Sequence, residues 1–451
     1  MTNFFQHKLN KKYLKYFLIL GWVSIWASLS INPMNIFSFY ENIELKLLNT
    51  YSLLELINVS RGSFQILYFI ILLVSTLILF KTKKNFFKSD IIFILFLIIF
   101  LIEIISLFKT DNSNTNVFFT ICSLNTILTV FLLKNFFSEV EVNLIFKLSI
   151  IFLIILLIFF GFQYLFVFFH YHINFYDAWG LVEQNFNLQV PRPTGLSRTA
   201  LIIFIFLSNI NLLRKPFDKI NHLIMIYSIV LLLLLSSRTT IFLYILYILF
   251  YIYYFKIFKI QKLLTLLKKF VFIPLVIIFI IGVIQNTNLF NKNNDSSSIL
   301  DNISSFSAKS TLRIYPSSGK VKNEEFSSGR INDWKKILKL NERKFFGNGV
   351  LGDRYLIDQS ASNLFLYTYA SSGIVGLFIL VCILLIILTC IWKRIFEKSK
   401  FDTYQFVSSI ILIGLMMRSI LETSYGVFGI DFILFCICFF LIMPNNSYEP
   451  N

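Results

Sequence analysis

Residues 364–391 read LFLYTYASSGIVGLFILVCILLIILTCI and contain no Asp, Glu, Lys or Arg. A charge-free apolar run of this length is typical of a helix that crosses the roughly 30 Å hydrocarbon core of a bilayer. Similar runs recur along the 451 residues, of which 57% are hydrophobic. A soluble core is usually built from shorter apolar segments. The sequence therefore predicts an integral membrane protein.

The apolar runs predict about twelve transmembrane helices. They fall near residues 16–31, 64–80, 91–108, 117–133, 144–169, 199–213, 223–237, 239–255, 270–284, 364–391, 404–421 and 427–443. The predicted fold is an all-α polytopic membrane protein with three regions. Residues 1–284 carry helices one to nine, residues 285–363 form a long periplasmic loop with short amphipathic helices, and residues 364–451 carry helices ten to twelve.

Lysines predict the orientation of the chain, because the loops retained in the cytoplasm carry most of the positive charge. Alternate connecting segments are lysine-rich, namely residues 8–15, 81–88, 134–147, 214–219, 256–269 and 393–400. This alternation predicts that both termini are cytoplasmic. The formal net charge of +17 comes in large part from these segments. We therefore expect a membrane lipid as a partner and no nucleic acid.

A short polar interruption decides the predicted orientation, across the membrane, of all the helices that follow it. Ser236, Ser237 and Arg238 divide an apolar stretch that runs from Leu223 to Phe255. As one continuous helix, this stretch would place the lysines of residues 256–269 outside. The charge rule therefore favours two helices joined by a tight outer turn, with Arg238 slightly below the membrane surface.

The second half of the long loop has a helical pattern. Ile331, Trp334, Ile337 and Leu338 recur at a spacing that gives one apolar stripe. This predicts a short helix lying on the membrane surface or on the helical body. A glycine turn is expected at residues 345–349, followed at residues 359–363 by caps for the next helix.

The arginines are sorted differently from the lysines. Nine of the eleven lie on the lysine-poor side, namely Arg61, Arg192, Arg198, Arg238, Arg313, Arg330, Arg343, Arg354 and Arg418. Arginine presents a planar fork of donors that matches phosphate and carboxylate. We interpret these side chains as an anion-binding face, and a lipid phosphate or pyrophosphate is the membrane-borne anion that fits best.

Two arginine positions near helix ends carry this interpretation. Arg192 and Arg198 flank a rigid turn that contains Gly195, just before a predicted helix, whose free amides would add to an anion site. The other reading is two ordinary interfacial arginines. Arg238 is a candidate because a charge at membrane depth needs a partner, and its alternative is a structural ion pair with Glu103 or Asp431.

Arg330 is the third position. It would stand in the first turn of the amphipathic helix, where the helix dipole favours an acid. An external anion would explain an arginine there, whereas the alternative is a solvated loop side chain. The acids Glu103, Glu422 and Asp431 are each a candidate partner for an arginine or a catalytic base, and the sequence does not rank them.

Metal and disulfide chemistry are not expected. His170 and His172 are two residues apart and do not share a helix face, and no third ligand has suitable spacing. The five cysteines all lie in apolar runs, which suits buried packing and not a disulfide framework.

The order of these motifs resembles the O-antigen ligase and O-antigen polymerase superfamily. The resemblance covers roughly residues 190–380. The matching residues are Arg192 and Gly195, Ser237 and Arg238, Gly329 and Arg330 with Trp334, Gly347 and Gly349, and Asn363, Leu366, Gly373 and Gly376.

This resemblance implies a glycosyltransferase of the bacterial inner membrane that acts on its periplasmic face. It would use a polyprenyl-pyrophosphate-linked oligosaccharide, with no metal or other cofactor. We expect Arg238 and Arg330 to be catalytic, and Arg192, Arg198, Gly195, Trp334 and Asn363 to bind substrate. A chain-length regulator is an expected partner. In the ligases a histidine precedes the asparagine, whereas this chain has Ser362 and no histidine after His222. This departure favours a repeat-unit polymerase over a ligase.

A lipid-linked oligosaccharide flippase or another transporter is the main rival. Twelve helices are common in transporters, and such a protein would also need arginines. However, transporters usually have related halves and charges in midplane cavities. In this sequence the arginines cluster at the outer rim, and the long loop has no counterpart in the first half.

Overall fold

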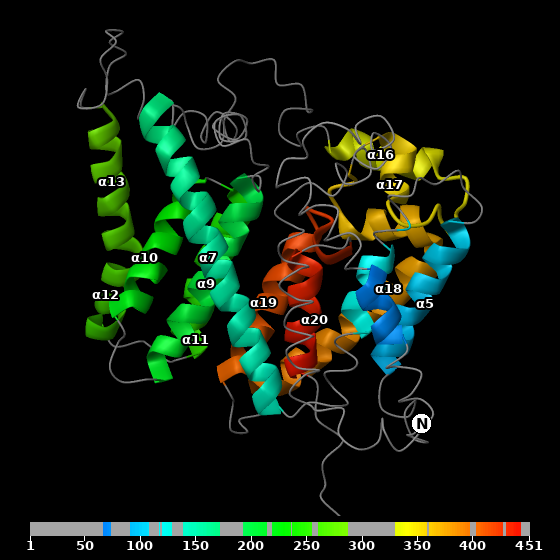
Figure 1. Ribbon diagram of the computed structural model, residues 1–451, viewed down its shortest axis with the longest axis horizontal. Helices are drawn as coiled ribbons and strands as arrows, with labels where there is room; N and C mark the ends of the chain where they lie inside the picture. Colours follow the sequence, from blue (N-terminus) through cyan, green and yellow to red (C-terminus); the bar gives the residue numbers. More distant parts are fainter. Residues whose placement is uncertain are drawn as a thin grey trace, which may run out of the picture. The chain divides into compact units, whose positions relative to one another are not determined.

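The structure is a computed structural model, shown in Figure 1. It describes residues 66–73, 91–107, 117, 120–128, 139–171, 193–213, 219–235, 237–254, 260–286, 330–358, 360–396, 403–426 and 430–442. Within these ranges the regular structure is helical and contains no strand. The predicted all-α class is confirmed for this part of the chain.

The helices have the following bounds: α5 Ile91–Leu107, α7 Glu139–Tyr171, α9 Pro193–Leu213, α10 Lys219–Leu234, α11 Arg238–Tyr254, α12 Ile260–Leu267, the π-helical turn η2 Lys268–Phe272, α13 Ile273–Asn286, α16 Arg330–Leu340, α17 Gly352–Ile357, α18 Leu364–Phe396, α19 Thr403–Ser419, the 3₁₀ turn η3 Ser424–Gly426 and α20 Ile430–Ile442. Helical residues also occur at 66–73 and 120–128. Each predicted span after the first therefore overlaps a helix, and the first, residues 16–31, lies outside the described residues.

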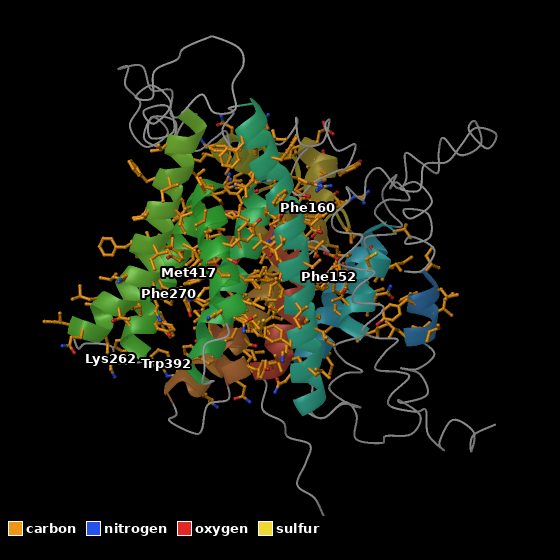
Figure 2. The ribbon with its side chains drawn as sticks, turned by 60° about the vertical axis from the view of Figure 1, so that its left-hand side comes forward. Phe152, Phe160, Lys262, Phe270, Trp392 and Met417 are labelled. Carbon is orange, nitrogen blue, oxygen red and sulfur yellow. The ribbon has the colours of Figure 1, made fainter. Side chains whose placement is uncertain are left out.

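Within the described residues, three helices are long and apolar enough to cross a membrane. They are Phe146–Phe169, Ile260–Val283 and Leu364–Lys393. α7 carries a row of exposed apolar side chains, among them Ile155 (57% exposed) and Phe162 (70% exposed), while Phe160 on another face is buried. The labels Phe152 and Phe160 mark this helix in Figure 2. A continuous apolar surface of this kind is unfavourable in water and suits contact with lipid.

The chain divides by its contacts into two compact units. Unit 1 comprises Met1–Ser149 and Arg330–Asn451, and unit 2 comprises Ile150–Gly329. In unit 1, α18 packs on α5 and α19, and α19 packs on α20. Edge-to-face rings join α5 to α20, with Phe96 and Phe435 5.9 Å apart between ring centroids. α16 and α17 pack on α18.

Unit 2 is a bundle in which α9 packs on α10 and α11, and α10 packs on α13. Its core is aromatic. Phe204 of α9 lies 5.1 Å from Tyr244, 5.4 Å from Tyr247 and 5.1 Å from Phe270 between ring centroids. Tyr247 is fully enclosed and exchanges a 2.6 Å hydrogen bond with the Ser208 hydroxyl, so the buried phenol keeps a polar partner.

Two local predictions have different outcomes. The predicted break between two helices is confirmed, because α10 ends at Leu234 and α11 begins at Arg238. The predicted rigid turn before a helix at residue 199 is wrong, because α9 begins at Pro193. Proline has a fixed φ and lacks an amide hydrogen, which suits the first position of a helix. Gly195 and Arg198 therefore lie within the opening turns of α9.

The loop that precedes α18 contains the predicted helix and glycine turn. α16 spans Arg330–Leu340 and buries Ile337 completely, whereas Ile331 and Leu338 remain exposed. Gly347 and Gly349 have φ values of +68° and +85°, which glycine adopts without steric cost. The amphipathic helix is thus present, with Ile337 as its main anchor.

α18 differs from the continuous helix that its apolar sequence predicts. Gly373 has a φ of +66° and a ψ of −162° and interrupts the helix. The freed carbonyls of Ala370 and Ser371 each accept a 2.8 Å bond, from the amides of Asn348 and Gly349 respectively. On the other side, the Ile374 amide donates to the Lys344 carbonyl over 2.8 Å. The break is therefore a stable part of the fold, because the preceding loop satisfies the hydrogen bonds of its backbone groups.

Candidate functional site

In unit 2, two helix starts lie side by side. Ser197 near the start of α9 and Thr240 near the start of α11 share a 2.7 Å hydroxyl–hydroxyl hydrogen bond. The Ser197 hydroxyl also lies 3.4 Å from the Leu232 carbonyl near the end of α10. Ser197 and Thr240 are both buried, so this bond fixes the two helix starts relative to each other.

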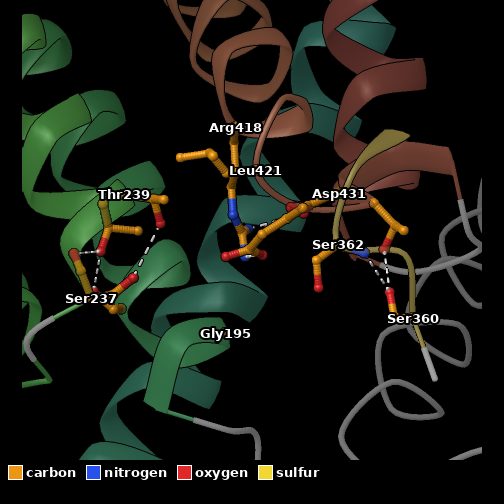
Figure 3. A network of polar contacts seen from close by, with 12 residues as sticks. Gly195, Ser237, Thr239, Ser360, Ser362, Arg418, Leu421 and Asp431 are labelled. Atoms are coloured by element: carbon orange, nitrogen blue, oxygen red, sulfur yellow. Dashed lines mark hydrogen bonds and ion pairs between the residues drawn. The ribbon is translucent and has the colours of Figure 1, made fainter. Parts of the chain in front are cut away.

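Ser237 forms the beginning of α11. Its carbonyl accepts the amide of Ile241 over 2.9 Å and the hydroxyl of Thr240 over 2.8 Å. Figure 3 shows the Ser237 and Thr239 hydroxyls in contact. Ser237 is therefore the residue at which the helix begins, and Arg238 is the first residue inside it.

Three of the predicted site residues are brought to this end of unit 2. Arg238 is the first residue of α11, and Gly195 and Arg198 lie in the opening turns of α9. A guanidinium nitrogen of Arg198 lies 3.8 Å from the position that a Cβ at Gly195 would occupy, so the side chain folds back over the glycine. Arg192 lies outside the described residues.

The described residues at this end carry positive charge only. The described ranges of unit 2, residues 150–171, 193–213, 219–235, 237–254 and 260–286, contain no Asp and no Glu. Helix amino termini carry partial positive charge and present free amides. The starts of α9 and α11 add this field to the charges of Arg198 and Arg238. Within these ranges the arrangement favours binding an anion.

In unit 1, two further predicted site residues, Arg330 and Asn363, contact the segment that follows α19. Arg330 donates from Nη1 to the Leu421 carbonyl over 2.9 Å. Asn363 donates from Nδ2 to the Ile420 carbonyl over 2.9 Å, and its Oδ1 accepts the Leu366 amide over 3.0 Å. The second bond confirms the predicted cap at the start of α18.

Trp334 contacts the residues that precede α18. Its indole nitrogen donates to the Ala361 carbonyl over 2.8 Å, two residues before Asn363. The sequence places Arg330, Trp334 and Asn363 in three separate motifs. The fold gathers them around residues 361–363 and 420–421, which we call the α19 rim.

Arg418 corrects the interpretation of the arginines as one anion-binding face. Its Nη1 lies 3.0 Å from Asp431, and its Nη2 is paired with Glu422. Figure 3 shows the ion pair with Asp431. Arg418 and Asp431 are 4% and 3% exposed. Two carboxylates already neutralise this arginine, so Arg418 has a structural role. A structural ion pair with Asp431 is the alternative that the sequence analysis gives for Arg238, and in the structure Arg418 forms it.

The three candidate acids are now distinguished by their surroundings. Asp431 is buried against Arg418. Glu103 is 5% exposed, and its Oε1 accepts a 3.1 Å bond from the Ser372 hydroxyl. Glu422 is the most accessible of the three, with 24% exposure. It follows Leu421, whose carbonyl accepts the hydrogen bond from Arg330.

Three polar residues that the sequence did not single out hold the loop before α18 in place. Asn341 donates to the Tyr369 carbonyl over 3.0 Å, and Asn348 donates to the Asn341 side chain over 3.1 Å. Asp353 accepts the Ala361 amide over 2.7 Å and the Arg354 amide over 2.9 Å. Burial raises the pKa of Asp353, and the bond from Ala361 opposes this shift in part.

Glycines are the one sequence signal for this region. Gly347, Gly349 and Gly373 belong to the pattern that resembles the superfamily, and their contacts explain why glycine is needed at Gly347 and Gly373. A Cβ on Gly347 would overlap the Ser371 backbone, and one on Gly373 would overlap the Phe345 carbonyl. The partners of Asn341 and Asp353 are distant in the chain, and no local pattern reveals them.

Comparison of the chain with protein-family models, with curated proteins and with solved structures finds no match in any of the three. Functional inference therefore rests on the residues and their geometry.

Proposed function

We propose that this chain is a membrane glycosyltransferase that polymerises polyprenyl-pyrophosphate-linked oligosaccharide repeat units on the periplasmic face of a bacterial inner membrane. In this proposal the chain has about twelve transmembrane helices with both termini in the cytoplasm. The observation that carries the proposal is the pair of helix starts in unit 2. Two joined helix amino termini, each with an arginine in its opening turns, form a site suited to a diphosphate.

The chemistry of the reaction explains why such a site would be useful. A hydroxyl oxygen of the acceptor sugar attacks the anomeric carbon of the donor, the bond from that carbon to the pyrophosphate oxygen breaks, and its electron pair stays on the pyrophosphate. Fixed positive groups stabilise this growing charge more in the transition state than in the ground state. In this scheme Arg238 and Arg198, with Arg192, bind the leaving pyrophosphate.

Within unit 1, the α19 rim is assigned separately to the binding of a sugar. The Trp334 ring suits one face of a sugar, and Arg330 and Asn363 supply donors beside it. The acceptor hydroxyl must lose its proton, and within unit 1 Glu422 is the most accessible of the three candidate acids. Its partner Arg418 is shared with Asp431, so the group of three carries one net negative charge.

Genetic complementation tests the reaction class. In a strain that lacks the gene, wild-type protein is expected to restore long surface glycan, whereas Arg238→Lys and Arg330→Ala leave single repeat units on the lipid core. A ligase-type transferase would instead leave no sugar attached there. Normal chain length with both variants would overturn the assignment of these arginines.

Binding tests the anion site directly. A polyprenyl pyrophosphate is expected to raise the melting temperature of the purified protein, and Arg198→Ala to abolish this rise. Turnover by Arg198→Ala should fall roughly 100- to 1,000-fold, the usual cost of removing one donor to a developing anion. Arg343→Ala, at an exposed position, is the matched control and is expected to behave as wild type.

A transporter of lipid-linked oligosaccharide remains the second candidate function, and one observation favours it. α18 is interrupted at Gly373 and faces the buried carboxylate of Glu103 through Ser372, and interrupted helices commonly line the substrate paths of transporters. Transport of a fluorescent lipid-linked oligosaccharide across vesicles distinguishes the two. Movement of the lipid without any chain growth would favour the transporter.

A further inference from the structure

The break in α18 places polar groups beside a buried acid. α5 packs along α18, and its only acidic residue is Glu103. The side chain is 5% exposed and lies where α18 is interrupted at Gly373. Ser371 and Ser372, the two residues before the break, are both fully buried. Ser372 donates its hydroxyl to Glu103 over 3.1 Å.

The helix does not continue regularly across Gly373, because the loop of residues 344–349 forms hydrogen bonds with the backbone groups on both sides of the break. That loop satisfies the carbonyls of Ala370 and Ser371 and the amide of Ile374. α5 is attached to the same loop, since the Ser106 hydroxyl donates to the Phe346 carbonyl over 2.7 Å. Glu103 is therefore fixed beside the break by contacts on both sides of it.

The charge of this site is not balanced by the described part of unit 1. Among those residues, Glu103 has no Lys, Arg or His partner, and a hydrogen bond from one hydroxyl does not neutralise a carboxylate. A buried ionised carboxylate without a counter-charge is strongly unfavourable. A positive charge must therefore accompany Glu103 when the protein is folded.

We propose that Glu103, with Ser372 and Ser371, forms a binding site for a single monovalent positive charge, either a proton or Na⁺. All of these ligand atoms are oxygens, which suits a hard cation or a proton and not a soft metal. One carboxylate is too little charge for a divalent ion in a buried site. The site is independent of the proposed glycosyltransferase reaction, because it uses none of the residues assigned to the sugar or the pyrophosphate.

Among the described residues, the other titratable groups near the site are few. Tyr367 of α18 interacts electrostatically with Glu103, and with Asp353 of α17. On α20, Asp431 is paired with Arg418. In the loop, the Lys344 side chain is exposed. These groups are the ones whose titration must be separated from that of Glu103.

The test is the melting temperature of the full-length protein in detergent, measured in choline chloride over a range of pH. If Glu103 carries a proton, the melting temperature falls by several degrees as pH rises, and Na⁺ does not restore it. If Glu103 binds Na⁺, NaCl restores the value at high pH, whereas choline chloride does not. Glu103→Gln, which keeps the shape and removes the charge, is expected to abolish either dependence.

Two further variants keep the test decisive if Glu103→Gln folds poorly. Ser372→Ala is expected to shift the midpoint of the pH or Na⁺ dependence without removing it. Glu342→Gln changes the same chemical group at an exposed position and is expected to leave the dependence as in wild type. An infrared band of a protonated carboxyl group, present in wild type and absent in Glu103→Gln, would identify the proton.

The proposal is overturned if the wild-type melting temperature does not respond to pH or Na⁺. It is also overturned if Glu103→Gln responds as wild type does. Glycan chain length gives a separate readout of the proposed glycosyltransferase, so failure of one proposal does not imply failure of the other.

Discussion

The arginines of the two units occupy different places in the fold. In unit 1, Arg418 is enclosed with Asp431 and Glu422, and Arg330 donates to a backbone carbonyl. In unit 2, Arg198 and Arg238 stand at two joined helix starts, and the described residues include no acid. Location in a lysine-poor segment does not make an arginine an anion-binding residue. Arg418 is a structural arginine because of its two carboxylate partners, whereas Arg198 and Arg238 remain candidates for function because of their positions at the helix starts.

The largest expected effect comes from breaking the ion pair of unit 1. Arg418→Met would leave Asp431 as an unpaired charge in a buried position, which typically costs about 3–5 kcal/mol. Chemical denaturation of the purified protein measures this loss. Arg418→Met with Asp431→Asn should recover much of it, and Lys339→Met, at an exposed site, should have little effect. If Arg418→Met were as stable as wild type, the pair would not be structural.

The next effect contrasts the interrupted helix of unit 1 with a regular helix of unit 2. Gly373→Ala forces a side chain into a backbone region that only glycine occupies easily and against the Phe345 carbonyl. A cost of roughly 2–4 kcal/mol in unfolding free energy is expected. At Gly282 in α13 a Cβ would meet nothing within 4 Å, so Gly282→Ala is the matched control. Equal melting temperatures for the two variants would argue against the break.

Asp353 is expected to have a smaller effect, and one that depends on pH. Asp353→Asn removes one of the two acceptors for the Ala361 and Arg354 amides and should cost about 1–3 kcal/mol. Because burial raises the pKa of Asp353 above its ordinary 3.8, the folded protein takes up the proton before the unfolded chain does.

The unfolding free energy of wild type should therefore gain a contribution from Asp353 as pH falls from neutral through the raised value towards 3.8. Asp353→Asn lacks this gain, and denaturation at several pH values measures the difference. Asp358→Asn, an exposed acid of the same loop, is the control. An identical pH profile for Asp353→Asn and wild type would contradict the assigned direction of the pKa shift.

The smallest effect tests the joined helix starts of unit 2. Ser197→Ala removes the bond to Thr240 and should cost about 1 kcal/mol in stability. It should also weaken the binding of a polyprenyl pyrophosphate, because the two helix starts are no longer held together. Thr265→Val, which removes an ordinary bond within α12, is the control for stability. Unchanged pyrophosphate binding in Ser197→Ala would show that the bond between Ser197 and Thr240 does not support the proposed anion site.

Local patterns of the sequence predicted much of the helical organisation. The lysine-rich segment 256–269 was assigned to a connection between helices and instead contains α12, Ile260–Leu267. The apolar runs located the other long helices, the polarity of Ser237 and Arg238 predicted the break between α10 and α11, and Asn363 was among the predicted helix caps. These features depend on residues within a few positions of one another. Apolar periodicity, a missing amide at proline and a capping side chain act over one or two helical turns, so the chain itself reveals them.

Tertiary structure alone decided which polar groups meet. Ser372 and Glu103 are 269 positions apart in the chain, and Arg330 and Leu421 are 91 apart. The sequence left Glu103, Glu422 and Asp431 equivalent, and it did not reveal the break at Gly373. The physical reason is that the free energy of a buried charge depends on which partner the fold brings to it. The sequence by itself determined that the chain is helical and suited to a membrane, while the packing of distant segments determined which arginine is neutralised and which acid is enclosed.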